Sequence, residues 1–358
     1  MNNRIFPLKI NKIQHLSPTI YSKLNLCQLR GILIANHFPA LLPTSPAAQI
    51  GIAIHKLYEQ AIIGNVNSDK DIEKIWTNII KIIENKMKKN PLESHLVPLE
   101  SSARNFEVKK IIAFRTVKNM MNNQKNGKKT SYYESEKWLE TDDGKIVGRI
   151  DLIKKKGNNI EITDFKTGRI TNKETGDSTP KKEYKLQMRM YAALYFNQYN
   201  VWPNKLTLEG SNKQHYEVRF NPDECIQIIE RAKNELDAIN VLIKKGKKPD
   251  YFSQPSEESC RFCTYRPACE KYWKIGSNSN KWPIDIIGVI KKKTRLGNGF
   301  YKITISDNSN CVTIRGLSKR HRFLNTNVNK IVICNVRSDT SPDHFIETPL
   351  TTGYVLET

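Results

Sequence analysis

The chain of 358 residues lacks several features that would place it in other classes of protein. No uninterrupted apolar run reaches the roughly 20 residues that a membrane-spanning helix needs. The opening segment, MNNRIFPLKINKIQHL, has no long apolar core of the signal-peptide type. A Gly-x-x-x-x-Gly-Lys-Ser/Thr phosphate loop is also missing, which argues against an ATP-driven motor. We therefore expect a cytoplasmic protein that has no membrane partner.

Acidic residues are few relative to basic ones. The 58 Lys and Arg residues against 36 Asp and Glu residues give a net charge of +22. Such an excess is typical of proteins that bind polyanions, most often nucleic acid. The alternative explanation is compositional, because Asn, Ile and Lys are all used heavily, as in proteins encoded by AT-rich genomes. Of these two explanations for the positive charge, we favour nucleic-acid binding.

The order of the expected elements indicates an α/β fold with a mixed central sheet wrapped by helices, as in restriction endonucleases. Apolar spacing predicts helices at 22–36, 47–63, 69–89, 105–122, 183–198 and 222–245, strands at 132–140, 146–153 and 160–166, and a possible hairpin at 206–220. The predicted domains are residues 1–275, a linker at 276–282, and a small all-β barrel at 283–358. We expect this C-terminal barrel to be OB-like and to bind nucleic acid, with a structural or partner-docking barrel as the alternative.

Two aspartates and a lysine lie within the segment GRIDLIKKKGNNIEITDFKTG. Asp151 and Asp164 fall on two β-branched runs joined by a Lys/Gly/Asn turn, which predicts a hairpin. Lys166 follows Asp164 by two residues, so both side chains project from one face of a strand. This arrangement predicts a metal site with a built-in cation, as phosphodiester cleavage requires. The alternative is a surface hairpin whose charges face water.

Two pairs of residues on predicted helices have the four-residue spacing that places them on one helix face. Gly51 and His55 form the first pair, and Gln187 and Tyr191 form the second. The glycine would allow another part of the backbone to approach closely. Taken singly, His55 is more often a half-buried structural histidine, and Gln187 and Tyr191 are more often ordinary surface residues.

Three of the seven cysteines form a C-x2-C-x5-C run at residues 260, 263 and 269. In an intracellular chain such spacing favours a metal or cluster over disulfides. Cys27 is the candidate for a fourth ligand, and four thiolates suit zinc or an iron–sulfur cluster. The irregular spacing favours the cluster. We expect Cys225, Cys311 and Cys334 to be buried apolar residues.

Together these motifs resemble the RecB-type nuclease domain of the PD-(D/E)XK superfamily. The similarity covers roughly residues 17–273 and rests on five motifs in order: Gly51-x-x-x-His55, Gly148-Arg-Ile-Asp151, Asp164-Phe-Lys166-Thr-Gly, Gln187-x-x-x-Tyr191, and Cys27 with Cys260, Cys263 and Cys269. They are most similar to the iron–sulfur branch, which includes CRISPR-associated RecB-like exonucleases and the AddB-type nuclease. The C-terminal barrel lies outside the resemblance.

The resemblance implies a role for each matching residue. His55, Asp151 and Asp164, with the Phe165 carbonyl, would ligate magnesium or manganese. Lys166 would orient the attacking water or stabilise the transition state. Gln187 and Tyr191 would position the DNA strand or hold Lys166. Of Glu134 and Glu136, which precede the hairpin, one is expected to reach the metal through water. Cys27, Cys260, Cys263 and Cys269 would hold an iron–sulfur cluster, with 4Fe-4S favoured.

The resemblance also implies an exonuclease acting on single-stranded DNA or DNA ends, in DNA repair or recombination or in antiviral defence. Its partner would be a helicase or a CRISPR-associated protein. Two alternatives stay open. One is a non-catalytic DNA-end-binding module or a subunit of a helicase–nuclease complex. The other is a zinc-containing nucleic-acid-binding protein whose charge and barrel carry the function.

Overall fold

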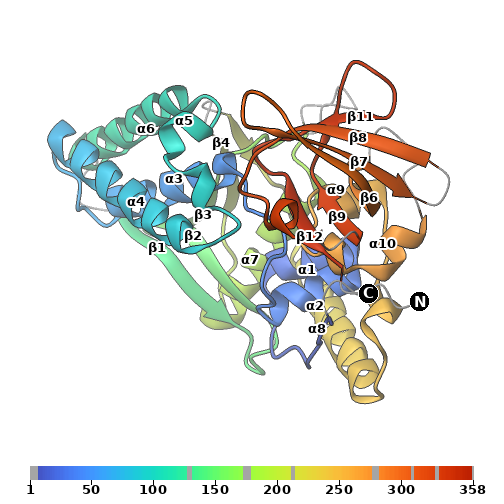
Figure 1. Cartoon of the computed structure of the whole chain (residues 1–358). Helices are drawn as coiled ribbons and strands as arrows, with labels where there is room; N and C mark the ends of the chain where they lie inside the picture. Colours follow the sequence, from blue (N-terminus) through green and yellow to red (C-terminus); the bar gives the residue numbers. More distant parts are fainter. Residues whose placement is uncertain are drawn as a thin grey trace.

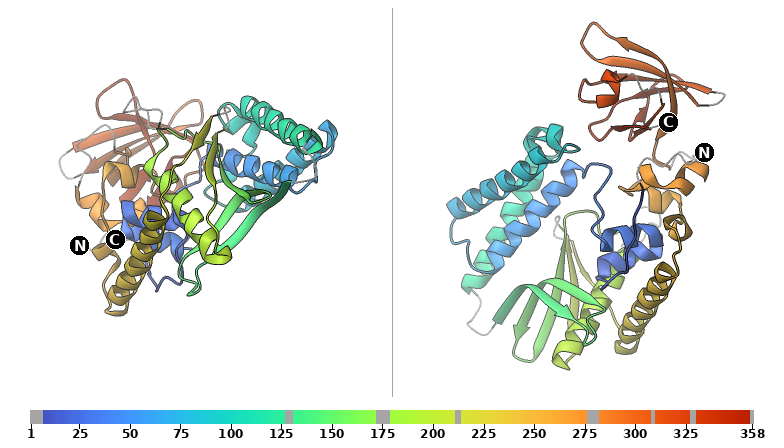
Figure 2. Two further views of the ribbon diagram at one scale, coloured as in Figure 1. Left: turned by 180° about the vertical axis from the view of Figure 1, so that it is seen from behind. Right: turned by 60° about the horizontal axis from the view of Figure 1, so that its bottom comes forward.

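The computed structural model describes residues 7–126, 131–171, 179–210, 214–275, 282–307, 310–326 and 330–356. Within these residues the chain forms two β-sheets, and the longer helices surround the first of them (Figure 1, Figure 2). None of the described helices combines the length and apolar character that crossing a membrane requires. The predicted linker at 276–282 lies outside the described residues except for Trp282.

The first sheet has the strand order β1-β2-β3-β4-β5. Its strands are β1 (Ser131–Glu140), β2 (Val147–Lys156), β3 (Asn159–Lys166), β4 (Lys205–Gly210) and β5 (His215–Glu217). Strands β3 and β4 are parallel, whereas the other neighbours are antiparallel. A parallel pair needs a long crossover, which helix α7 (Lys182–Tyr199) supplies. The predicted mixed sheet and the predicted hairpin of β2 and β3 are therefore confirmed.

Helices pack on the first sheet in two hydrophobic clusters. One cluster joins the sheet to α1 (Pro18–Leu26), α2 (Gln28–Ala35), α7 and α8 (Pro222–Lys244), and it includes Ile162 of β3. The other gathers α3 (Pro46–Ile62), α4 (Asp69–Lys89) and α6 (Phe106–Asn126) around Phe165 of β3. Successive strand residues face opposite sides, so β3 is covered on both faces. Strand β3 therefore runs between α7 and α3.

The N-terminal helical region is divided at Cys27. The sequence predicts one helix over 22–36, but the structure ends α1 at Leu26 and begins α2 at Gln28. Cys27 has an extended backbone, with φ −164° and ψ 113°. Its sulfur accepts a hydrogen bond from the backbone N–H of Gln254 at 3.4 Å. The break thus coincides with a contact to a distant segment, which apolar spacing alone does not reveal.

The second sheet contains the C-terminal strands in the order β10-β11-β8-β7-β6-β9-β12. These are β6 (Ile286–Arg295), β7 (Tyr301–Asp307), β8 (Asn310–Leu317), β9 (Lys330–Cys334), β10 (Arg337–Ser338), β11 (His344–Ile346) and β12 (Thr352–Val355). The β-strand content is as predicted. However, β10 and β12 are the two edges of this order among the described residues, so the OB-like barrel is not confirmed.

Short helical segments connect these elements. They are η1 (Ser94–Leu96), α5 (Leu99–Ser102), η2 (Pro249–Phe252), α9 (Glu257–Arg261), η3 (Arg266–Ala268), α10 (Glu270–Ile275) and η4 (Arg322–Asn325). Segments η2, α9, η3 and α10 lead from α8 to the second sheet, and α9 and η3 carry or flank the C-x2-C-x5-C run.

A buried ion pair joins the second sheet to the cysteine-containing segment. The Arg266 guanidinium donates to the two carboxylate oxygens of Asp285 at 2.5 and 3.2 Å, and their side chains are 3% and 1% exposed. The same guanidinium donates to the backbone carbonyl of Cys263 at 3.0 Å and to the side chain of Asn335 beyond β9. The buried Arg266 guanidinium thus connects the cysteine-containing segment to residues of the second sheet.

Candidate active site and cysteine site

The sheet register brings three carboxylates into one row. Leu152 pairs with Thr163 across β2 and β3, and continuing this register places Asp151 opposite Asp164. On the other side of β2, Ser135 pairs with Leu152 and Lys137 with Ile150, which places Glu136 opposite Asp151. Glu136 has φ +52°, an unusual value for a residue other than glycine. The three acidic side chains therefore come from neighbouring positions on three adjacent strands.

Asp164 and Lys166 are in contact, as their spacing on β3 predicts. Lys166 Nζ lies 2.6 Å from Asp164 Oδ2, and their side chains are 16% and 3% exposed. Gln187 of α7 accepts a hydrogen bond from Lys166 Nζ at 2.8 Å and donates one to Asp164 Oδ1 at 3.1 Å. The Lys166 ammonium also lies 4.7 Å from the ring centroid of Tyr184. The lysine is thus held beside the aspartate by two residues of α7.

Tyr191 connects this group to strand β2. Its hydroxyl accepts a hydrogen bond from Gln187 Nε2 at 2.8 Å and donates one to the backbone carbonyl of Arg149 at 2.9 Å. A Cβ atom at Gly148 would lie 3.0 Å from the Tyr191 ring and 2.7 Å from Leu194. Gly148 is therefore needed for α7 to pack closely on β2. The predicted pair Gln187 and Tyr191 does share a helix face, and that face points at Asp164.

Helix α3 brings His55 to the same carboxylates. His55 Nδ1 lies 3.6 Å from Asp151 Oδ2, which also accepts a hydrogen bond from the Phe165 backbone N–H at 2.8 Å. Burial lowers the pKa of His55 below its usual value, and this effect exceeds the opposing one of Asp164. The imidazole is therefore neutral near pH 7, the form that ligates metals. One turn earlier, a Cβ atom at Gly51 would meet the Thr167 side chain at 2.7 Å, so the predicted close approach is made by Thr167.

The aspartates lie in surroundings that disfavour two negative charges. Burial raises the pKa of Asp151 well above its usual range, and the neighbouring Asp164 raises it further, while the Phe165 N–H opposes the shift. A bound divalent cation would reverse this effect by stabilising both carboxylates. In addition, Asp164 Oδ2 is buried and makes no well-directed hydrogen bond within the described part of the chain, although Lys166 Nζ is close to it.

These donors suit a hard divalent cation by their chemistry, because carboxylates with one imidazole are ligands of magnesium and manganese. The side chains as they lie do not form a closed ligand set. No group of three or more His, Cys, Asp or Glu side chains among the described residues has a geometry that could hold a metal ion. The ligand roles of His55, Asp151, Asp164 and the Phe165 carbonyl therefore remain predictions.

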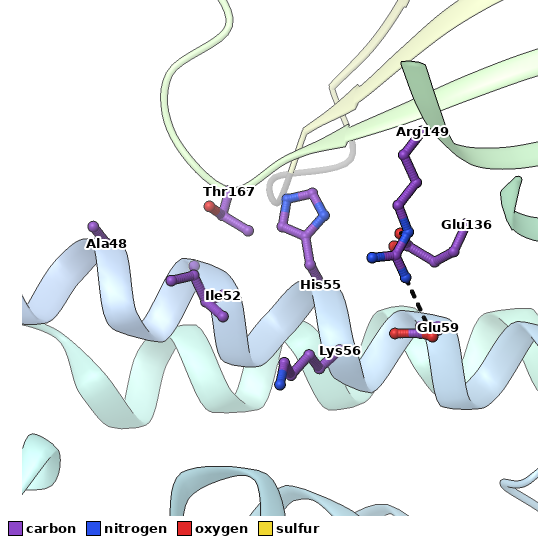
Figure 3. A pocket seen from close by; sticks show the side chains of 9 residues that line it. Ala48, Ile52, His55, Lys56, Glu59, Glu136, Arg149 and Thr167 are labelled. Atoms are coloured by element: carbon purple, nitrogen blue, oxygen red, sulfur yellow. Dashed lines mark ion pairs between the residues drawn. The ribbon is translucent and has the colours of Figure 1, made fainter. Parts of the chain in front are cut away.

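A cavity of about 590 Å³ opens beside His55 (Figure 3). It is lined by Ala48, Gly51, Ile52, His55, Lys56, Glu59, Glu136, Arg149 and Thr167. Arg149 of β2 forms an ion pair with Glu136 of β1 and lies 4.0 Å from Glu59 of α3. The lining thus comes mainly from α3, with Glu136 of β1 and Arg149 of β2 on the opposite side, and neither Asp151 nor Asp164 is part of it.

Four residues of this site either were not predicted from the sequence or were predicted only as one of two candidates. Of the two glutamates considered, Glu136 lines the cavity, whereas Glu134 pairs with Lys155 and Lys137. Glu59 lies four residues after His55, a spacing that could have identified it. Arg149 lies inside the Gly148–Asp151 motif, and Tyr184 lies one helical turn before Gln187. In each case, the short distance in the sequence to a predicted site residue could have identified it.

The four predicted cysteines line one cavity between α2 and the segment 253–269. Its lining comprises Cys27, Leu29, Arg30, Leu33, Ser253, Pro255, Ser259, Cys260, Cys263, Tyr265, Arg266 and Cys269. The Cys269 sulfur lies 3.0 Å from the Ser253 hydroxyl. Burial raises the pKa of Cys263 to about 11, against the influence of Arg30. The Cys263 thiol is therefore protonated unless a metal holds it as a thiolate.

The other three cysteines have different surroundings. Cys225 and Cys334 are buried, as expected, whereas Cys311 is exposed on β8, which contradicts its expected burial. Alternation along the strand explains the difference, because Ile314 faces the core of the second sheet and Cys311 lies at the solvent-facing end of β8.

The fold and the site together define a nuclease-like α/β protein with buried acidic and basic residues beside an open cavity. Residues 15–270 match the family described as the PD-(D/E)XK nuclease superfamily, so the chain belongs to this superfamily. Its members are generally nucleases and typically use magnesium or manganese. This supports a metal-dependent nuclease with DNA as the implied substrate. The match does not distinguish the iron–sulfur branch from others.

Comparisons with individual proteins add little to this assignment. No curated protein matches the chain. A solved structure described as "Crystal structure of SSO0001" is similar over 52% of this chain and 96% of its own, with 17% sequence identity and a TM-score of 0.25. A TM-score this low does not establish a shared fold.

Proposed function

We propose that this protein is a metal-dependent deoxyribonuclease that acts as an exonuclease on single-stranded DNA or DNA ends. The observation that carries the proposal is the Asp164–Lys166–Gln187 group, in which a half-buried lysine is fixed 2.6 Å from a buried aspartate, beside Asp151. Buried charges are costly unless paired. The neighbouring cavity is lined by His55, which lies 3.6 Å from Asp151, and it is large enough to admit part of a ligand. Exonuclease action is proposed from the family resemblance.

Each residue has a part in the proposed hydrolysis. His55, Asp151, Asp164 and the Phe165 carbonyl would hold magnesium or manganese, which polarises the phosphate and lowers the pKa of a bound water. Lys166 orients the attacking water or donates to the phosphate oxygens as charge develops on them. Gln187 keeps the ammonium in place, and Tyr191 fixes Gln187 to the backbone of Arg149. The neutral form of His55 is the one this arrangement requires.

The proposed cellular setting is DNA repair or recombination or antiviral defence. A helicase or a CRISPR-associated protein would be the partner that supplies single-stranded DNA. The proposed nuclease domain covers residues 1–275, and the C-terminal strands at 283–358 would contact nucleic acid or the partner. The basic charge of the chain supports a polyanionic substrate.

A cleavage time course tests the activity. The wild type, Lys166→Ala and Lys156→Ala are purified without oxygen and incubated with end-labelled linear and circular single-stranded DNA, with manganese or EDTA. We expect manganese-dependent loss of the linear DNA by the wild type and by Lys156→Ala, whose lysine is exposed at the end of the same hairpin. Lys166→Ala should be inactive. Cutting of the circle would indicate an endonuclease, and no cutting by the wild type would favour the DNA-end-binding module.

We further propose that Cys27, Cys260, Cys263 and Cys269 hold an iron–sulfur cluster, most simply 4Fe-4S. All four line one cavity, and the Gln254 N–H and Ser253 hydroxyl lie against two of the sulfurs. Thiolates in this number suit either a cluster or zinc. The cluster would join Cys27 to the segment 260–269 and stabilise the fold.

Metal analysis of the anaerobically purified protein distinguishes an iron–sulfur cluster from a zinc ion. We expect bound iron and sulfide and a brown colour, whereas a zinc protein would be colourless. Cys263→Ala should lose the iron and melt at a lower temperature, because an opened ligand set no longer joins the two segments. Cys311→Ala is the matched control, since Cys311 is exposed and distant in the sequence. A Cys263→Ala protein with full iron content and an unchanged melting temperature would exclude the assignment.

A further inference from the structure

The side chain of Arg149 extends from β2 into the cavity beside His55 (Figure 3). It is 57% exposed, whereas the acidic residues nearest to it, Glu136 and Glu59, are half-buried. Asp151 follows it by two residues on β2, which corresponds to a separation of about 7 Å along a strand. The guanidinium is therefore close to the proposed metal ligands and still accessible from the cavity.

Two glutamates hold this guanidinium at one end. Its Nε atom pairs with Glu136 of β1, whereas Nη2 lies 4.0 Å from Glu59 of α3. The second distance is too long for a hydrogen bond. Within the described residues, neither terminal nitrogen of Arg149 donates a hydrogen bond to a protein acceptor. The planar end of the side chain thus keeps donors that an incoming group can use.

The backbone of Arg149 is fixed by the catalytic group. Its carbonyl accepts the hydrogen bond from Tyr191, which in turn is bonded to Gln187 and through it to Asp164 and Lys166. Gly148 allows α7 to approach at this point. The base of the Arg149 side chain is therefore held in a constant position relative to Asp164, while its tip remains accessible.

We infer that Arg149 binds a phosphate of the nucleic-acid strand next to the phosphate that is cleaved, with Glu136 and Glu59 orienting its guanidinium. Arginine suits this role because its fork of N–H donors matches phosphate oxygens and its charge is permanent. The inference rests on the proposed function, since it requires that the cavity receive a phosphodiester chain. It adds a substrate-binding residue that comes from β2 and faces α3.

A purely structural role would be different. Arg149 would then serve only to balance the negative charges of Glu59, Glu136 and Asp151. Its removal would lower the stability of the protein but would not change the number of phosphate contacts made with DNA. Each phosphate contact to a single strand contributes about 0.7 to the slope of log affinity against log salt concentration. The salt dependence of binding therefore separates the two roles.

The test measures binding of a fluorescent single-stranded oligonucleotide by the full-length protein, with EDTA present to prevent cleavage, over a series of salt concentrations. The variants are Arg149→Ala, Arg149→Lys and Arg231→Ala. Arg231 is an exposed arginine of α8 and serves as the matched control. Melting temperatures are recorded for all of them.

We expect Arg149→Ala to reduce the salt slope by about 0.7 and to weaken binding several-fold at moderate salt. Arg149→Lys keeps the charge and should recover most of the slope, and Arg231→Ala should match the wild type. An unchanged slope in Arg149→Ala, or in Arg149→Gln should the alanine variant not fold, would overturn the inference. This result is distinct from a failure of the proposed function, which would appear as a wild type that binds DNA and does not cleave it with manganese.

Discussion

Asp164→Asn is expected to lower the rate of DNA cleavage by at least about a thousandfold while binding of DNA stays within a few-fold of the wild type. The substitution keeps the size of the side chain but removes the charge that would hold the metal. Metal catalysis contributes several kcal/mol to transition-state stabilisation, and each 1.4 kcal/mol or so corresponds to a tenfold change in rate. Initial rates with manganese and a binding titration with EDTA give the two quantities.

The structure offers a matched control on the same strand. Glu161 lies three residues earlier on β3, where it accepts a hydrogen bond from Thr207 and lies 3.6 Å from Lys205. Glu161→Gln removes a carboxylate of β3 away from Lys166 and should retain activity. A variant Asp164→Asn that cleaves at the wild-type rate would show that this carboxylate is not a metal ligand, whatever the activity of the control.

Asp285→Ala is expected to reduce the stability of the protein by about 3–5 kcal/mol, the usual cost of leaving a buried charge without its partner. Asp285 accepts hydrogen bonds from Arg266, from the Asn335 backbone N–H at 2.8 Å and from the Tyr272 hydroxyl at 2.9 Å. Its loss would leave the Arg266 guanidinium buried beside Cys263 without a counter-charge. Thermal melting and urea unfolding measure the effect.

The double variant Arg266→Met, Asp285→Leu tests whether the loss of stability comes from leaving Arg266 without its counter-charge. Replacing both members of a buried ion pair by apolar residues is often close to neutral, so this protein should recover a large part of the lost stability. Asn335 and Tyr272 would still lack their acceptor, so recovery should be incomplete. If Asp285→Ala is as stable as the wild type, the buried pair does not hold the second sheet to the cysteine-containing segment.

Elements with strong local signals were predicted closely. Helix α4 has the predicted bounds of 69–89, because Ser68 caps its first turn and its apolar side chains recur at helical spacing. The β2–β3 hairpin was likewise predicted from its turn residues and β-branched runs. The break at Cys27 was missed, since no proline or glycine marks it. The parallel pairing of β11 with β8 was missed as well, because it depends on partners distant in the sequence.

The candidate site was predictable in part for the same reason. The contact between Asp164 and Lys166 follows from their spacing on one strand, and the shared face of Gln187 and Tyr191 follows from their spacing on a helix. The choice between Glu134 and Glu136 depends on the register of β1 against β2, which places Glu136 rather than Glu134 opposite Asp151 and which the sequence does not specify. The position of Arg149 beside Glu59 depends on how α3 packs against the sheet.

The two candidate sites differ in when they can form during protein synthesis. Strands β2 and β3, helix α7 and strand β4 follow one another within residues 147–210, so all residues of the proposed catalytic group have been synthesised once this stretch leaves the ribosome. Cys27 must instead wait for Cys269, about 240 residues later, which corresponds to roughly 10–50 s at ordinary rates of translation. The nascent chain therefore passes through a period in which strands β2–β4 are present but the cluster that we propose for Cys27, Cys260, Cys263 and Cys269 cannot yet form.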